Sequence, residues 1–499
     1  MDEYLRLDQH GRTTAPEGKT LEFKRDLSSP DGPLRTLVAF ANSAGGRLVI
    51  GVTDDGTVVG VDDPLAEEER IASLIDDRIS PQLVPAIDLV TLRDKTVLII
   101  DVPLSTRRPH YITRLGPEAG VYVRLGSTTR QADPALVAEL ERNARGIAFE
   151  GLPEPRAAFE DLDLEVLSKL RERSTSVADL LALGLAVQQG DQIVPTNAGI
   201  LAACPDPTRF HPSAWVQCGR LRGPHGTDIF DQTEIHGPMP LAVDRAMEFL
   251  LKHAYKTAVF GQVRRRDIYS IPIEPIREVI VNALVHASYA ERSTPIRVGF
   301  YDDRIQVDSP GLLLPGMTID TMRRVSRLRN PALARIFREA GIMEQWGTGI
   351  QRVFEQVAEA GLPEPIIEEI QDRVRVTIYI PNHDPQQATA RGAREPEGEA
   401  QKPAEDHNHP EHTYTHSNVG RYDVVMMRAA AQGPVHRNAL LEAAGLKPLS
   451  QNYTRHVVPL VNRGLLAMTI PDKPRSKAQR YILTDEGRAY LRHLTEDSE

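Results

Sequence analysis

The stretch Leu37–Val52, LVAFANSAGGRLVIGV, decides the fold of the first part of the chain. Around its start, apolar residues recur at the spacing of one helix face: Leu34, Leu37, Val38 and Ala41. The run 42–46 has small residues and ends in two glycines, which is typical of a helix end. Residues 47–52 predict a strand, and the turn at 54–56 predicts its return through 58–61 as a β-hairpin. This order indicates a mixed α/β unit.

Composition and pattern divide the rest of the chain into further segments. Strands are predicted at 96–102 and 120–125, and a helix at 134–145 begins after Asp133, a good N-cap residue. The part after residue 381 is rich in Gln, Ala, Glu, Pro and His without apolar periodicity, which is typical of a disordered linker. We therefore expect a multidomain, mixed α+β protein with these segments: 1–150, 151–270 as a connecting domain, 271–381, the linker 382–420, and 421–499.

Bulk properties limit the class of protein. A chain of 499 residues exceeds what one core usually organises, and no apolar run approaches the roughly 20 residues that cross a bilayer. The first residues lack the pattern of a signal peptide, so we expect a cytoplasmic protein that does not enter membranes. The net charge of -10 argues against a chain coated in nucleic acid, although a local basic patch could still bind it.

Three carboxylates near the start of the chain form the first candidate site. Glu17 and Glu22 flank a short turn, and Asp54 follows the predicted strand 47–52. If these strands lie side by side, the carboxylates converge, and hard oxygen ligands suit Mg²⁺ or Mn²⁺. The ion would activate water for phosphodiester hydrolysis. The alternative is two surface acids and a turn residue, with no metal. Three nearby cations could hold the phosphate backbone: Lys24, Arg25 and Arg47.

The N-terminal blocks resemble the AlbA-like domain of the Schlafen family. The matching blocks are 17–24, 40–46, 51–56 and 122–128, in the family's order. The resemblance implies that Glu17, Glu22 and Asp54 are the metal-dependent site that cleaves tRNA and rRNA in nuclease-competent members. Many bacterial relatives instead resemble DNA-binding transcriptional regulators. Vertebrate nucleases join two such lobes into a clamp, and this chain shows one, which implies a homodimer.

A second candidate site begins in the stretch 276–289, IREVIVNALVHASY. Glu278 and Asn282 are one helical turn apart and share a face, so they could hold Mg²⁺ and orient water. Strands are predicted at 296–300 and 305–307, and the glycines of 346–350 would let a backbone approach phosphates closely. Taken alone, each of these features is a weak signal and is better explained as a surface helix, a turn or a loop.

The order of these features resembles the GHKL ATPase group, especially the C-terminal domain of RecG-related proteins. By that resemblance Asn282 coordinates Mg²⁺, Glu278 orients the attacking water and Asp308 reads adenine. Four further residues would lie against bound ATP: Gly311, Gly347, Thr348 and Gly349. The adenine motif departs from the group's Asp-x-Gly-x-Gly because Pro310 follows Ser309. No Walker-type phosphate loop occurs in the chain, so the helicase name is not carried over.

The last segment predicts a winged helix-turn-helix. Its helices are predicted at 435–443 and 450–463, and the run 471–480 is a basic wing between two strands. Its expected nucleic-acid contacts are Gln451, Asn452, Arg455, Lys473, Arg475, Lys477 and Arg480. The alternative is a winged helix used for protein contacts.

Two hypotheses follow from these patterns. The first is a DNA-binding transcriptional regulator whose activity ATP modulates, and the patterns favour it because a tethered winged helix suits promoter binding. The second is an ATP-gated, metal-dependent endoribonuclease that cleaves tRNA or rRNA, for instance in phage defence. Enzymatic activity stays open between that ribonuclease and a weak ATPase at Glu278.

Overall fold

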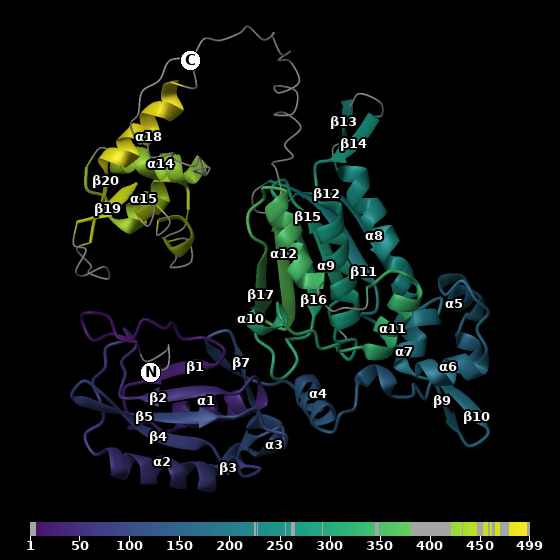
Figure 1. Ribbon diagram of the computed structural model, residues 1–499, viewed down its shortest axis with the longest axis horizontal. Helices are drawn as coiled ribbons and strands as arrows, with labels where there is room; N and C mark the ends of the chain where they lie inside the picture. Colours follow the sequence, from purple (N-terminus) through teal and green to yellow (C-terminus); the bar gives the residue numbers. More distant parts are fainter. Residues whose placement is uncertain are drawn as a thin grey trace, which may run out of the picture. The chain divides into compact units, whose positions relative to one another are not determined.

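The computed structural model describes residues 6–223, 226, 228–254, 256–260, 265–291, 293–344, 349–380, 421–431, 433–446, 453–457, 460–461, 465–469 and 479–496. The chain forms two compact units, Met1–Glu395 and Pro396–Glu499. Within the first unit we distinguish an N-terminal domain (residues 6–144) and a central domain (residues 149–380) (Figure 1). The predicted linker 382–420 lies outside the described residues. Among the residues described, no helix has the length and apolar character that crossing a membrane requires.

A four-stranded sheet organises the N-terminal domain. Its strand order is β1 (Leu21–Lys24), β2 (Gly46–Ile50), β5 (Lys95–Val102) and β4 (Ala86–Leu92), with β1 parallel to β2 and the other pairs antiparallel. Helices α1 (Asp31–Asn42) and α2 (Pro64–Arg78) share one buried cluster with the sheet residues Leu48, Ile50, Leu98 and Ile100. The domain continues through β3 (Ile79–Ser80), β6 (Tyr111–Ile112), α3 (Gly116–Ala119), β7 (Tyr122–Leu125), β8 (Thr128–Gln131) and α4 (Pro134–Ala144).

The predicted helix, the strands after it and the helix at 134–145 are present, but the predicted hairpin is wrong. Strand β2 is central, so β1 and β5 already occupy both of its hydrogen-bonding edges. Gly51 has a φ of 101°, where the chain leaves the sheet, and the returning segment pairs with it only over the short stretch around the Val52–Val58 bridge, with hydrogen bonds from the Thr53 amide to Thr57 O and from the Val59 amide to Gly51 O. The position of β1 beside β2 brings Glu22 opposite Leu48.

A six-stranded sheet organises the central domain. Its order is β12 (Asp228–Ile235), β11 (Val216–Arg222), β15 (Ile296–Phe300), β16 (Arg304–Pro310), β18 (Arg373–Tyr379) and β17 (Ile366–Ile370). Only β11 and β15 pair in parallel among these neighbours. Strands β11 and β12 belong to this sheet, so the structure differs from the predicted boundary at residue 270. One sheet and one core span both predicted segments.

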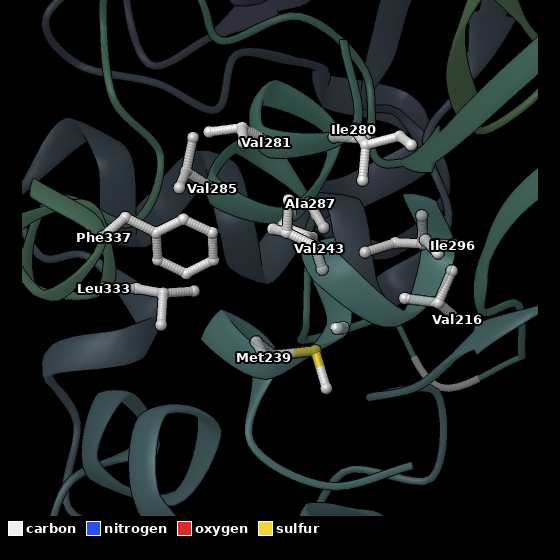
Figure 2. Close-up of a cluster of buried hydrophobic side chains, with 14 of the residues drawn as sticks. Val216, Met239, Val243, Ile280, Val281, Val285, Ala287, Ile296, Leu333 and Phe337 are labelled. Atoms are coloured by element: carbon white, nitrogen blue, oxygen red, sulfur yellow. The ribbon is translucent and has the colours of Figure 1, made fainter. Parts of the chain in front are cut away.

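Helices bury one face of this sheet. They are α8 (Met239–His253), α9 (Ile273–His286), α11 (Pro331–Glu339) and α12 (Gly349–Glu359), with α5 (Leu164–Leu170), α6 (Val177–Leu183) and α7 (Asn197–Ala203) beside them. Figure 2 shows Val216 and Ile296 of the sheet near Val243 of α8 and Ile280 of α9. The remaining described elements are α10 (Ile319–Met322) and two hairpins, β9 (Ala186–Gln189) with β10 (Gln192–Pro195) and β13 (Lys256–Phe260) with β14 (Arg265–Tyr269). This arrangement fixes the face of α9 that carries Glu278 and Asn282.

Polar contacts join the N-terminal and central domains. Lys19 Nζ lies 2.6 Å from Glu369 Oε2 in an ion pair whose side chains are 12% and 3% exposed. The Gly316 amide donates a 2.6 Å hydrogen bond to the carbonyl oxygen of Ser43, next to the end of α1. Arg329 also pairs with Glu139 of α4. The two domains of the first unit are therefore in direct contact.

The C-terminal unit contains short helices and one small hairpin. These are α14 (Arg421–Ala430), α15 (Arg437–Ala443), a π-helical turn at Tyr453–Val457, β19 (Leu466–Met468), β20 (Tyr481–Leu483) and α18 (Asp485–Glu496). Leu440, Val457 and Tyr481 are among the side chains of its core. The described elements follow the predicted order of helices, hairpin and final helix.

Candidate functional site

Glu22 lies on β1 between two cationic side chains. Its Oε1 is 2.5 Å from Lys24 Nζ, and its Oε2 is 3.0 Å from Arg124 Nη1 of β7. Arg124 is only 1% exposed and also contacts Gly18 O at 2.5 Å and the Phe40 ring at 5.2 Å. A buried guanidinium needs a counter-charge, and Glu22 supplies it. Lys24 and Arg124 thus neutralise the Glu22 carboxylate, which is the role that a bound metal ion would have.

The other two predicted carboxylates lie in different surroundings. Glu17 is exposed, and its Oε1 accepts a 2.9 Å hydrogen bond from the Phe23 amide, on the free edge of β1. Asp54 is exposed in the turn after Val52, where Asp55 makes the local hydrogen bonds to Thr53 and Thr57. The described part of the chain contains no group of three or more His, Cys, Asp or Glu side chains that could hold a metal ion. The predicted convergence on Mg²⁺ or Mn²⁺ is therefore not seen in this arrangement.

The three cations predicted beside these carboxylates differ in availability. Lys24 pairs with Glu22, and Arg47 Nε donates a 2.8 Å hydrogen bond to Asp101. Arg25 is 75% exposed and lies 3.9 Å from Asp26. Arg25 therefore presents the most accessible charge of the three.

Glu278 and Asn282 project from α9 into a deep pocket. Asn282 Nδ2 donates a 3.0 Å hydrogen bond to Glu278 Oε1, as expected for residues one helical turn apart. The pocket has about 1080 Å³ of empty space, open solvent included, and its walls come from α9, the sheet and the segment 311–329. Its polar groups include Arg327 and Arg352, while most of the lining is apolar. An apolar pocket with a few converging polar groups is the usual form of a small-molecule or cofactor site.

Gly349 begins α12 directly against Glu278. A Cβ atom at this position would lie 1.7 Å from Glu278 Oε1, so a larger residue would displace the carboxylate. The start of an α-helix favours negative charge because its amides are unsatisfied there. Phosphates could occupy this position beside Asn282. The residues Gly347 and Thr348, predicted to contact phosphate, lie outside the described residues.

Asp308 does not enter the pocket. Val307 and Ser309 line it, whereas Asp308 points to the opposite face of β16, since side chains alternate along a strand. Arg375 binds Asp308 with two hydrogen bonds of 2.6 and 2.7 Å, and this pairing raises the pKa of Arg375. The prediction that Asp308 reads adenine does not fit this geometry. Ser309 and Gly311 occupy the corresponding wall.

The sequence prediction also missed His286, which lines the pocket one helical turn beyond Asn282. Burial lowers the pKa of His286 to about 4, so its ring is neutral at pH 7. Arg329, another lining residue, donates to the His286 carbonyl oxygen at 2.9 Å. The spacing of Glu278, Asn282 and His286 on one helix face was the available signal.

Most predicted contacts of the C-terminal unit cannot be placed. Gln451, Asn452, Lys473, Arg475 and Lys477 lie outside the described residues, as does the side chain of Arg455. Arg480 is described, and its amide donates to Thr469 Oγ1 at 3.1 Å beside the hairpin of β19 and β20.

Three family models match parts of the chain. Residues 17–133 match "Schlafen, AlbA_2", and residues 293–378 match "Putative ATP-dependent DNA helicase recG C-terminal". Residues 424–484 match "Filamentation induced by cAMP protein Fic-like, C-terminal domain". The class of the chain is thus a Schlafen-type AlbA domain followed by an ATPase-like domain. Within that class it is similar to RecG-related proteins, and the resemblance stated from sequence is confirmed for these two domains. The winged helix stays a prediction.

Solved structures give weaker likenesses. The DIP2311 protein of Corynebacterium diphtheriae is 20% identical, with 76% of this chain and 79% of that chain covered and a TM-score of 0.37. The N-terminal domain of a RecG-related protein from Nitrosomonas europaea is 29% identical over 24% of this chain and 86% of that chain, with a TM-score of 0.19. A Fic family protein from Desulfovibrio desulfuricans G20 is 14% identical over 71% of this chain and 77% of that chain, with a TM-score of 0.13. No curated protein matches.

The two domain matches indicate the function of the chain in general terms. An AlbA domain of the Schlafen type suggests a nucleic-acid partner, and an ATPase-like domain suggests ATP binding. The pocket beside Asn282 lies largely within the second matched region.

Proposed function

We propose that this protein is a DNA-binding transcriptional regulator whose nucleic-acid binding is modulated by ATP. The observation that carries the proposal is the pairing of Glu22 with Lys24 and Arg124. A hydrolytic metal site needs carboxylates free to bind the ion, and this carboxylate already neutralises a buried arginine. The N-terminal domain is then a binding module rather than a nuclease.

ATP would bind in the pocket of the central domain. Its volume and apolar lining suit a nucleoside, and Asn282, Glu278 and the start of α12 are the groups that would hold Mg²⁺ and phosphate. A bound Mg²⁺ would neutralise phosphate charge. Ser309 and Gly311 would lie beside the base in place of Asp308. Because Asp308 is turned away from the pocket and paired with Arg375, the base would be held without a carboxylate contact.

The C-terminal unit would supply further DNA contacts through the predicted wing, Lys473, Arg475, Lys477 and Arg480. Basic residues in such a wing bind phosphates and add affinity with little sequence information. A homodimer would place two N-terminal domains on one DNA site, as the predicted clamp requires.

One experiment separates the regulator from the endoribonuclease that Glu17, Glu22 and Asp54 would otherwise form. Labelled tRNA is incubated with the protein and Mn²⁺, with and without ATP, beside the Glu22→Gln variant, and binding to a DNA library is measured in parallel. We expect intact tRNA in every sample and DNA binding that changes with ATP. Cleavage by the wild type that depends on Mn²⁺ would establish the nuclease and overturn the regulator.

A further inference from the structure

Two arginine-bearing segments meet where the N-terminal and central domains join. Arg107 and Arg108 lie in the loop that follows β5, and Arg324 and Arg327 lie in the segment 311–329 that walls the pocket. Arg107, Arg324 and Arg327 are exposed, and Arg108 is half-buried. We call these four residues the junction arginines.

The contacts around Gly316 bring the two segments together. A Cβ atom at Gly316 would lie 2.9 Å from Leu104 Cδ2 and 3.1 Å from Arg327 Nη1, so the loop and the guanidinium meet over this glycine. The Gly316 amide also binds the Ser43 carbonyl oxygen. Burial, and to a smaller extent the nearby charge of Arg327, lowers the pKa of Arg108.

The described residues offer these arginines no acidic partner. Within the described residues, no carboxylate lies within 4 Å of any of the four. Backbone oxygens hold two of them, since Arg327 Nη1 donates to Pro315 O at 2.7 Å and Arg108 donates to Ser105 O. Holding like charges together is unfavourable unless an anion binds them, and guanidinium groups match phosphate oxygens well.

We propose that the junction arginines form a binding surface for the phosphodiester backbone of nucleic acid, built jointly by the two domains. The proposal rests on the proposed function, because nucleic acid is the phosphate-bearing partner that the AlbA domain suggests. Neither Arg107 nor Arg324 lines the ATP pocket, so these two contacts are separate from nucleotide binding. The surface adds contacts beyond Lys24, Arg25, Arg47 and the wing.

The test compares two doubly substituted full-length proteins. R107Q/R324Q removes one charge from each domain at the junction, and R114Q/R335Q removes the same charges from exposed, acid-paired positions of the same domains. Binding to labelled duplex DNA and to a labelled hairpin RNA is measured by fluorescence anisotropy between about 50 and 200 mM salt. ATP affinity, measured by calorimetry, checks that each variant is folded.

We expect R107Q/R324Q to weaken nucleic-acid binding roughly 10-fold to 100-fold at about 0.1 M salt, because each lost phosphate contact removes close to one decade. The slope of log K against log salt should fall by about 0.9 per contact for duplex DNA and by less for unpaired strands. The DNA and RNA arms show which backbone is preferred. R114Q/R335Q should bind as the wild type does.

Two results would overturn the inference, and they have different meanings. If the wild type binds nucleic acid and both variants bind with the same affinity and slope, the junction arginines are not the surface, and the proposed function stands. If the wild type binds neither DNA nor RNA, with or without ATP, the proposed function falls as well.

Discussion

Replacing Glu22 by glutamine should destabilise the N-terminal domain. The substitution keeps the size of the side chain and removes its charge, while Arg124 stays charged and 1% exposed. Lys24 is 30% exposed and can turn toward water. Most of the lost stability therefore comes from the unpaired charge of Arg124. Breaking a buried ion pair by removing one partner typically costs about 3 to 5 kcal/mol.

The geometry supports the lower end of this range. At the 3.0 Å separation of Glu22 and Arg124, two unit charges attract by about 5.5 kcal/mol at an effective dielectric constant of about 20. Arg124 keeps its contacts with Gly18 O, Thr129 and the Phe40 ring, which offset part of the loss. We therefore expect the free energy of unfolding to fall by roughly 3 kcal/mol. Adding Arg124→Met to the Glu22→Gln variant should recover part of the lost free energy of unfolding.

Urea unfolding at pH 7, followed by circular dichroism, measures this difference. Glu17→Gln is the matched control, because a glutamine oxygen can still accept the hydrogen bond from the Phe23 amide, and we expect a change below about 1 kcal/mol. A metal site predicts the opposite sign: without metal, crowded carboxylates repel, and Glu22→Gln would stabilise the protein. A stabilised variant, or a wild type whose melting temperature rises specifically with Mn²⁺, would refute the structural role of Glu22.

Three further predictions concern the central domain. Asn282→Ala should weaken Mg-ATP binding at least 10-fold in calorimetry, from the loss of a metal-directed amide worth about 1.4 kcal/mol or more; unchanged binding would remove the site assignment. Gly349→Ala should also weaken ATP binding, since its Cβ would displace Glu278, and equal affinity in the two proteins would show that this close approach is unimportant. Burial raises the pKa of Glu150 from 4.5 to about 7, although its carboxylate accepts the Ala332 and Leu333 amides. The folded state therefore binds this proton more tightly than the unfolded state does. Protonation of Glu150 thus adds roughly 3 kcal/mol to the free energy of unfolding below pH 4.5, and this contribution is lost as the pH rises through about 7. Thermal melts across this range should show a steeper decline for the wild type than for Glu150→Gln, and parallel declines would contradict the assignment.

Local patterns predicted the elements well. Helix α1, strand β5 and helix α4 follow from apolar spacing, glycine stops and N-cap chemistry, which are properties of neighbouring residues. The prediction of a hairpin after β2 was wrong because β2 is a central strand, and both of its edges pair with strands that are distant in sequence. Turn chemistry alone does not show which edge of a strand remains free.

In the candidate sites, too, contacts between residues close in sequence could be predicted, and contacts made by tertiary packing could not. Glu278 and Asn282 lie together because helical spacing determines their contact. Asp308 was misplaced, although the alternation of Ile305 and Val307 already puts Ser309 on the helix side of β16. The partner of Glu22 could not be predicted, because Arg124 reaches it from β7 through tertiary packing.

The hydrogen bond from Gly316 to Ser43 O gives the domain junction a direct experimental reporter. A backbone amide exchanges its hydrogen with deuterated solvent only when its bond opens, so the exchange rate at Gly316 measures how often the two domains separate there. Leu314 and Met317, close to Gly316 in the chain, line the pocket. The exchange rate of a single amide can therefore show whether a ligand bound in the central domain changes the contact at the end of α1.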